Sequence, residues 1–228
     1  MSTGDRGETK QRLRAAAAAL FAERGFHGAT MRDLAERGGV NLAASHYHYG
    51  SKRDLYLEVL REQFAAVRSE LERSGAALPA RGLRQLGRDA LIELLRLRSR
   101  VMLTMLIGTP PALHGALMQR EMCDPSEALP VIVDEFLQPM MLDLQRILTL
   151  LAPGLKPATI ERCAFSIVGQ AMFYQITRPA LQRMKNIDSY PANFIATTAD
   201  HIVEFSLGGL ERLAEEQNKR SRRKRGEE

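Results

Sequence analysis

Apolar residues recur along most of the chain at intervals of three and four residues, which is the spacing of an amphipathic helix. No stretch alternates apolar and polar residues in the way that a half-buried strand does. We therefore predict an all-α fold. The predicted helices cover residues 9–24, 31–37, 42–49, 51–73, 81–107, 110–122, 126–151, 157–186 and 191–217.

Prolines and glycines separate these helices and indicate where the domains divide. The pairs Pro110-Pro111 and Asp124-Pro125 precede predicted helices, where proline is tolerated because the first backbone N–H groups of a helix have no intrahelical partner. A loop at 74–82, rich in small residues, marks the start of a second domain. We expect domains over 1–55 and 56–218, followed by a basic, disordered tail over 219–228.

The segment over residues 30–54 has the signals of a helix-turn-helix. Thr30 and Asp33 form a candidate capping box, a shorter version of the Ser/Thr-x-x-Glu pairing. Gly38-Gly39 breaks the first helix because glycine adopts the left-handed backbone of a sharp turn. Asn41 can cap the second helix. Two short helices around a glycine turn are typical of proteins whose second helix enters the major groove of DNA.

Several residues of this segment match one family when they are taken together. Ala35 is a small residue at the helix crossing, Gly39 makes the turn, Tyr47-His48-Tyr49 is similar to a Tyr-His-Phe motif, and Gly50-Ser51-Lys52 opens the next helix. With this spacing, residues 8–60 resemble the DNA-binding domain of TetR-family transcriptional regulators. The resemblance implies a sequence-specific DNA-binding regulator whose C-terminal helical domain binds a ligand and forms a dimer.

Two positions depart from the family's usual pattern. Ser45 lies where the family usually has Val or Leu against the helix crossing, and His46 lies where Tyr or Asn is commoner. A buried Ser45 hydroxyl can bond back to the carbonyl of Asn41. We expect these two residues to give the recognition helix its own tilt and its own operator preference.

The helix-turn-helix and the resemblance together nominate a set of DNA-facing residues. Asn41 can read adenine, Leu42 and Ala43 can meet a thymine methyl group, and Tyr47 resembles the family's phosphate-binding tyrosine. Each of them alone can also be a solvated surface side chain. The full set is Thr30, Arg32, Asn41, Leu42, Ala43, Ala44, His46, Tyr47 and Lys52.

The predicted helix over 157–186 is apolar on two sides, and the helix over 191–217 offers a similar surface. A helix that is apolar nearly all round must be buried nearly all round. In TetR-like proteins the last two long helices form a four-helix dimer interface, so the resemblance implies a homodimer through 157–186 and 191–217. A two-fold dimer presents two recognition helices to successive major grooves of a palindromic, double-stranded DNA operator.

Eight of the ten methionines lie between residues 102 and 184. Methionine fills irregular cores and also lines permissive ligand pockets, so both interpretations stay open. The candidate effector-binding residues are Met102, Met105, His114, Met118, Glu121, Met122, Met140, Gln170, Met172, Tyr174 and Arg178. The stretches HGALMQREMCDP and SIVGQAMFYQITRP also resemble a TetR subgroup that is linked to the control of efflux and membrane-transport genes.

Composition and charge limit the partners. The hydrophobic content of 45% is ordinary for a soluble protein. No secretory or membrane-spanning segment is expected, and Cys123 and Cys163 form no disulfide framework, which indicates a cytoplasmic protein without a membrane partner. The net charge is +5, and six of the seven residues in 219–225 are basic. This run predicts a solubilising tail or an accessory contact with nucleic acid.

Patterns for catalysis and metal binding are missing from the sequence. It contains no G-x-S-x-G, P-loop, G-x-G-x-x-G or H-E-x-x-H motif. His46 and His48 would point to nearly opposite sides of a helix, so one ion cannot easily take both. We expect no enzyme activity, cofactor or metal.

The combined prediction is a ligand-responsive repressor of transport, efflux or stress genes that a small apolar or amphipathic effector releases from its operator. Two alternatives remain at this point. One is a nucleoid-type protein that binds DNA through charge alone, and the other is an enzyme or ligand carrier that keeps the N-terminal fold.

Overall fold

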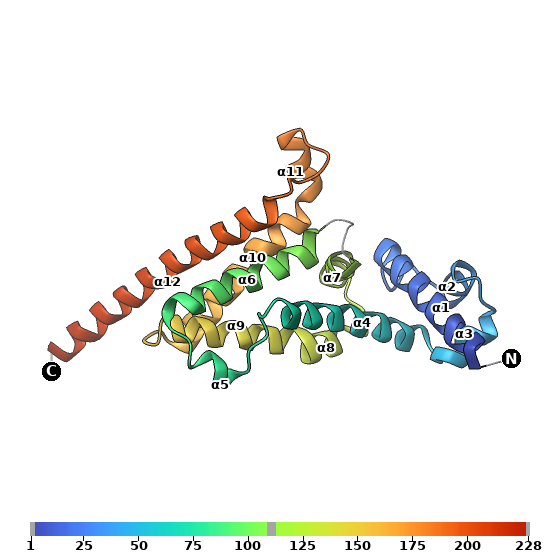
Figure 1. Ribbon diagram of the computed structural model, residues 1–228, viewed down its shortest axis with the longest axis horizontal. Helices are drawn as coiled ribbons and strands as arrows, with labels where there is room; N and C mark the ends of the chain where they lie inside the picture. The colour runs from blue at the N-terminus through green and yellow to red at the C-terminus, as the bar shows by residue number, and fades with distance from the viewer. Residues whose placement is uncertain (1–2, 109–112, 227–228) are drawn as a thin grey trace. The chain divides into compact units, whose positions relative to one another are not determined.

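The computed structural model describes the backbone of residues 3–108 and 113–226 and the side chains of 7–108 and 113–220. Every regular element in these ranges is helical, which confirms the all-α prediction (Figure 1). The elements are α1 (Thr3–Arg24), α2 (Met31–Arg37), α3 (Leu42–Tyr49), α4 (Lys52–Arg73), α5 (Ala80–Leu83), α6 (Arg88–Ile107), α7 (Leu113–Cys123), α8 (Leu129–Ile132), the π-helical turn η1 (Val133–Leu137), α9 (Gln138–Leu151), α10 (Pro157–Ile176), α11 (Arg178–Lys185) and α12 (Phe194–Gly226).

Three predicted helices are each divided into shorter ones. The helix expected over 126–151 becomes α8, η1 and α9, and both α8 and α9 have a proline in their first turn. The helix expected over 157–186 ends at Ile176, and Pro179 lies in the first turn of α11. Proline fits there because it lacks an N–H group that the helix interior would need. Gly87 caps α6 and separates it from α5.

Contacts within the chain divide it into two units. Unit 1 contains Met1–Arg68 and Pro110–Phe136, and unit 2 contains Ser69–Thr109 and Leu137–Glu228. The division differs from the boundary expected at residue 55, because most of α4 packs with the N-terminal helices. It also places α7, α8 and η1 with those helices, although they lie in the middle of the sequence.

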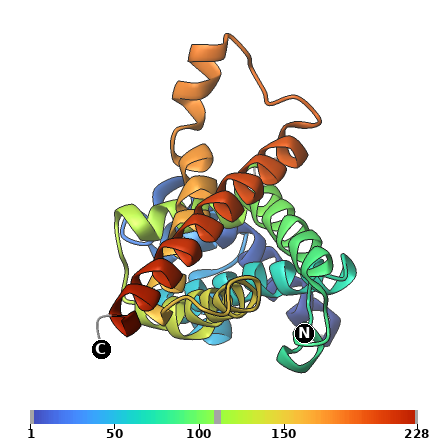
Figure 2. The ribbon, with the colours of Figure 1, turned by 90° about the vertical axis from the view of Figure 1, so that its left-hand side faces the viewer.

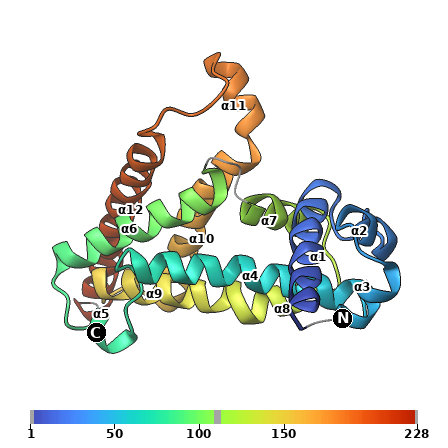
Figure 3. The ribbon, with the colours of Figure 1, turned by 45° about the vertical axis from the view of Figure 1, so that its right-hand side comes forward.

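Unit 1 is built around the apolar face of α1. Leu13, Phe21, Leu34 and Tyr56 are fully buried and bring α1, α2 and α4 together. The ring of Phe21 meets the edge of the Tyr56 ring, with 4.7 Å between centroids, and Phe26 lies 5.1 Å from Tyr56. α7 also packs along α1 (Figure 3). The helix-turn-helix therefore rests on a core to which two distant parts of the sequence contribute.

Unit 2 is a bundle in which α6, α9, α10 and α12 pack on one another. Its core includes Leu95, Leu103, Ile147, Ile167 and Ile202, all of which are almost completely buried. α11 has no buried residue, and Figure 2 shows it standing away from α10 and α12 together with the loop that follows. None of the described helices is long and apolar enough to cross a membrane.

The end of α12 differs from the prediction of a disordered tail over 219–228. The helix continues to Gly226, through most of that segment. Lysine and arginine are good helix formers, so a basic composition does not by itself interrupt a helix that has already begun. The prediction rested on composition alone and gave no weight to this propensity.

Candidate DNA-binding site

Capping interactions set the bounds of α2 and α3. The Asp33 N–H donates to the Thr30 hydroxyl over 3.1 Å, and the Thr30 N–H donates to the Asp33 carboxylate over 2.9 Å, which confirms the capping box. The Thr30 hydroxyl also donates to the Asp33 carboxylate over 2.6 Å, and this bond, with the one from the Thr30 N–H, holds the pKa of Asp33 below its usual value. Gly39 has a φ of +60°, and the Asn41 side chain accepts from the Ala43 N–H over 2.8 Å. α3 therefore begins directly after a tight turn with a satisfied first turn.

α3 has an inner and an outer face. Ser45 and Tyr49 are buried, whereas Tyr47 keeps 75% of its surface exposed. Most of the predicted DNA-facing residues are exposed to solvent. They are Thr30, Arg32, Asn41, Leu42, Ala43, His46 and Tyr47, and Ala44 is half-buried. With an exposed leucine in its first turn and an exposed tyrosine in its second, this short helix presents a surface that can enter a groove of DNA.

Ser45 is buried as predicted, but its hydrogen bond differs. Its hydroxyl donates to the Leu42 carbonyl over 2.7 Å, whereas the Asn41 carbonyl accepts only the Ser45 backbone N–H. A serine side chain reaches carbonyls three as well as four residues back, and here the nearer one is within reach. The Nδ1 atom of His46 lies 2.9 Å from the Gly50 carbonyl, so the His46 ring is held at the C-terminal end of α3.

Lys52 is engaged inside unit 1. Its ammonium group donates to the Phe26 carbonyl over 2.9 Å and lies 4.1 Å from the centre of the Phe26 ring. This bond uses one of the three N–H donors of the group, so the place of Lys52 among the DNA-facing residues stays a prediction. A cation over an aromatic ring is attracted by its quadrupole, so Lys52 fixes the loop between α1 and α2 to the start of α4.

Two contacts fix the helix-turn-helix to α1. The Arg37 guanidinium at the end of α2 donates through both terminal nitrogens to the Glu23 carboxylate, each over 2.5 Å, and this pairing holds the pKa of Glu23 low. The Tyr49 hydroxyl at the end of α3 donates to the Lys10 carbonyl over 3.2 Å. A bidentate Arg–carboxylate pair also fixes orientation, because both groups are planar.

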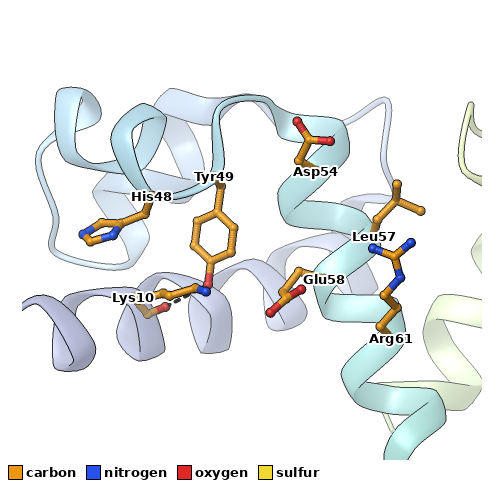
Figure 4. Close-up of a pocket in the computed structure, with 7 residues that line it drawn as sticks. All are labelled: Lys10, His48, Tyr49, Asp54, Leu57, Glu58 and Arg61. Carbon is orange, nitrogen blue, oxygen red and sulfur yellow. Dashed lines mark hydrogen bonds between the residues drawn. The ribbon is translucent and has the colours of Figure 1, made fainter.

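A hollow of about 250 Å³ lies beside this contact in unit 1 (Figure 4). Figure 4 shows Tyr49 reaching down to Lys10, with Asp54, Glu58 and Arg61 along one side of α4. Charged groups of both signs line it, and Glu58 is 3.9 Å from Arg14. Such a hollow has no net preference for an anion or a cation. No group of three or more His, Cys, Asp or Glu side chains that could hold a metal occurs among the described residues.

The candidate effector residues are shared between the two units and do not gather in one. His114, Met118, Glu121 and Met122 are on α7 in unit 1. Those in unit 2 are Met102, Met105, Met140, Gln170, Met172, Tyr174 and Arg178. Gln170 and Tyr174 line a hollow of about 490 Å³ on the outer side of α10 and α12.

The unit 1 candidates are engaged within their own unit. Glu121 is 1% exposed, and its carboxylate accepts from the Tyr56 hydroxyl over 2.9 Å and from the Ser126 N–H over 3.3 Å. The His114 ring meets the edge of Phe64, and burial lowers the pKa of His114 to about 4. Sequence reasoning singled out Glu121 but missed Tyr56 and Arg120, because spacing along a helix does not show which distant residue a side chain will meet.

The elements so far define a class: a helix-turn-helix DNA-binding unit joined to a separate helical bundle. Residues 13–59 match the model for bacterial regulatory proteins of the tetR family, and residues 91–210 match the C-terminal domain of the HTH-type transcriptional dual regulator CecR. The chain belongs to the TetR family of transcriptional regulators. Members of this family regulate transcription and are not enzymes, as predicted.

Individual relatives are similar over parts of their length. CecR of Shigella flexneri is 32% identical over 148 residues, which cover 62% of this chain and 63% of CecR. The transcriptional repressor AcnR of Corynebacterium efficiens is 33% identical over 84 residues, which cover 36% of this chain and 45% of AcnR. The matched regions thus span less than two thirds of these relatives.

Solved structures share the fold over most of the chain. A TetR-like regulator from Rhodococcus sp. RHA1 has a TM-score of 0.65 at 19% identity, covering 89% of this chain and 96% of that one. AibR, solved in complex with isovaleryl coenzyme A and operator DNA, has a TM-score of 0.62 at 14% identity, covering 86% and 97%. At these identities the likeness concerns the fold alone.

Proposed function

We propose that the protein is a homodimeric, ligand-responsive transcriptional repressor that binds a palindromic operator in the cytoplasm. The observation that carries the proposal is the outer face of α3, where Tyr47 is 75% exposed beside the buried Ser45 and Tyr49. A residue of this size left in solvent next to a capped turn is ready to contact DNA.

The first turn of α3 is the part that reads bases. Asn41 can accept and donate to adenine, and Leu42 and Ala43 can pack on a thymine methyl group. Tyr47 and Thr30 contact phosphates, with the free N–H groups of the α2 N-terminus adding to the attraction. His46 can contact DNA through Nε2, since its Nδ1 atom already lies against the Gly50 carbonyl.

Dimerisation is supported by large apolar side chains left in solvent on α10 and α12. Phe165, Phe173 and Phe205 are 56%, 51% and 68% exposed. Exposed aromatic residues gathered on one face are typical of a protein interface. A second copy of the same face would cover them around a two-fold axis, and a dimer has the two recognition helices that half-sites about 34–36 Å apart on DNA require.

The effector site belongs to unit 2 in this proposal. Met102, Met172 and Tyr174 are partly buried against its core, and methionine adapts to ligands of varied shape. An apolar or amphipathic molecule there releases the operator only if it binds the released conformer more tightly. The two stretches that resemble the efflux-linked TetR subgroup support efflux or transport genes as targets.

The test begins by selecting bound sequences from random double-stranded DNA and measuring affinity by fluorescence anisotropy. We expect Tyr47→Ala to weaken binding to the selected operator at least about 100-fold, the loss of a phosphate contact and of groove packing together. Light scattering should show an unchanged dimer. Equal affinity for the selected and a scrambled sequence at physiological salt would instead indicate the nucleoid-type alternative.

A further inference from the structure

α11 and the loop that follows it, residues 178–193, project from the bundle of unit 2. We refer to this segment as the arm. No side chain of α11 is buried by the described part of the chain, and Figure 2 shows the helix standing away from α10 and α12. A helix of eight residues is only marginally stable alone in water, because nucleation costs more than one or two turns return. Its own unit does not give the arm the packing that usually stabilises so short a helix.

The base of the arm is held by aromatic contacts. The Tyr190 ring stacks on Phe194 with 3.9 Å between centroids, and Tyr174 meets the edge of Phe194 over 5.6 Å. The Arg178 guanidinium lies 5.6 Å from the centre of the Tyr190 ring. These contacts join the two ends of the arm at the place where α10 ends and α12 begins.

The tip of the arm is closed by hydrogen bonds of its own. Asn186 has a φ of +53°, and the Ile187 N–H donates to the Gln182 carbonyl over 3.0 Å. A residue in the left-handed region commonly ends a helix in this way. The Gln182 side-chain amide also donates to the Asp188 carbonyl over 2.7 Å. The arm is therefore preorganised, which lowers the entropy lost when it meets a partner.

An exposed apolar row continues from α10 onto the arm. Phe173 and Ile176 in the last turn of α10 are 51% and 50% exposed, and Met184 on α11 is 80% exposed. With the exposed Ala180 these residues recur at intervals of three and four, and Thr177 alone separates the two helices. A continuous row of this kind is typical of a surface that another molecule covers.

The row is continuous with the face on which we place the dimer contact. Phe173 belongs to the row and also lines the hollow of about 490 Å³ that contains Gly169 and Phe205. An added Cβ at Gly169 would meet no atom within 4 Å, so the hollow is open there to a side chain from another chain. TetR-family regulators act as homodimers. A second copy is therefore the partner that this continuity favours.

We propose that the arm packs on α10 and α12 of the second copy, and that Met184 of each copy enters the hollow of the other. This inference rests on the proposed homodimer and specifies which segments pair in it. An unbranched methionine side chain adapts to an irregular recess. Arg183 points to another side of α11, because successive residues of a helix differ in direction by about 100°.

The matched test variants of the full-length protein are Met184→Gln and Arg183→Gln. Both positions are exposed, and glutamine is a good helix former, so neither change should disturb the fold. Sedimentation velocity should show that Met184→Gln raises the dimer dissociation constant at least about tenfold, because an apolar contact is lost twice in a two-fold dimer. Arg183→Gln should stay within about twofold of the parent. An unchanged constant in Met184→Gln would overturn the proposal.

A photo-reactive benzophenone side chain in place of Met184 identifies what the arm touches. Isotopically heavy and light copies are mixed and irradiated. We expect cross-links between heavy and light chains that map to residues 157–176 or 194–210. Cross-links confined to single chains would contradict the proposal. If Arg183→Gln weakened operator binding and left the dimer dissociation constant unchanged, the arm would instead contact DNA, and the proposal would be wrong.

Light scattering of the parent separates the two levels of the argument. A monomeric parent would overturn the homodimer and the arm contact together. A dimeric parent whose dissociation constant is unaffected by Met184→Gln, and whose copies do not cross-link through position 184, would contradict the arm contact alone.

Discussion

At the scale of single residues, unit 1 holds its buried polar groups in different ways. Glu121 has partners on both carboxylate oxygens, and the Ser45 hydroxyl has the Leu42 carbonyl. The Nδ1 atom of His114 is buried and has no partner among the described residues. Burial without a hydrogen bond favours the neutral form of an imidazole, so His114 is the residue whose environment makes unit 1 sensitive to pH.

We predict that unit 1 loses stability as the pH falls from 7 to 5. Burial lowers the pKa of His114 from 6.5 to about 4, so the unfolded state binds its proton first. Stability is then fully present above the unfolded pKa and falls as the pH drops toward the folded one, by about 2 kcal/mol between pH 7 and 5. Denaturant unfolding at both pH values measures it.

His114→Phe is the matched control for this prediction. The variant keeps a ring against Phe64 but has no titrating nitrogen. The free energy of unfolding of the variant should therefore change about 2 kcal/mol less between pH 7 and 5 than that of the parent. An identical dependence in the parent and the variant would show that another group is responsible.

The hydrogen-bond partners of single side chains are the part of the structure that the sequence predicts least. The capping box of Thr30 and Asp33 was predictable because its partners lie three residues apart. The partners of Lys52 and Glu121 lie 26 and 65 residues away, so only the folded chain shows them. The place of Lys52 near a helix start does not by itself predict its contact with the Phe26 carbonyl.

At the scale of elements, the turn between α2 and α3 determines how the recognition helix is presented. Gly39 has a φ of +60°, and an added Cβ would meet no atom within 4 Å. A side chain at position 39 would therefore cost free energy through its strained backbone conformation and not through a steric clash.

Gly39→Ala should lower the free energy of unfolding of unit 1 by about 1 kcal/mol. Gly39→Asn should cost less, because asparagine tolerates the left-handed region. The pair is compared by denaturant unfolding, with operator affinity measured alongside. If alanine proved as stable as asparagine, the turn would not need the positive φ that the structure assigns to it.

The elements themselves followed from the sequence where periodicity and caps agreed. α2 and α3 were predicted to the residue, since each has a capping side chain and a glycine stop. The longer helices were joined wrongly because apolar periodicity continues across a break such as Thr177, after which α11 begins at Arg178 with Pro179 in its first turn. The position of α7, α8 and η1 in unit 1 was not predicted, because the sequence places them between α6 and α9, which belong to unit 2.

At the scale of the whole molecule, the proposed binding to a palindromic operator requires two recognition units at a fixed spacing, and in this proposal the outer face of α10 and α12 supplies the contact that pairs them. Phe205 lines the hollow on that face with Phe173, Gln170 and His201. Covering such a face removes roughly 25 cal/mol of unfavourable free energy for each Å² of apolar surface that leaves water. A charge placed in it would be desolvated without a partner.

Phe205→Asp should therefore shift the protein from dimer to monomer in light scattering. Its operator affinity should fall at least about 100-fold, since a single recognition unit contacts only one half-site. Leu142→Asp is the matched control: Leu142 is 44% exposed on α9 of the same unit and does not line that hollow, and its variant should stay dimeric and bind the operator like the parent. A dimeric Phe205→Asp protein would move the interface to another surface, and the expected spacing of about 34–36 Å between recognition helices would lose its basis.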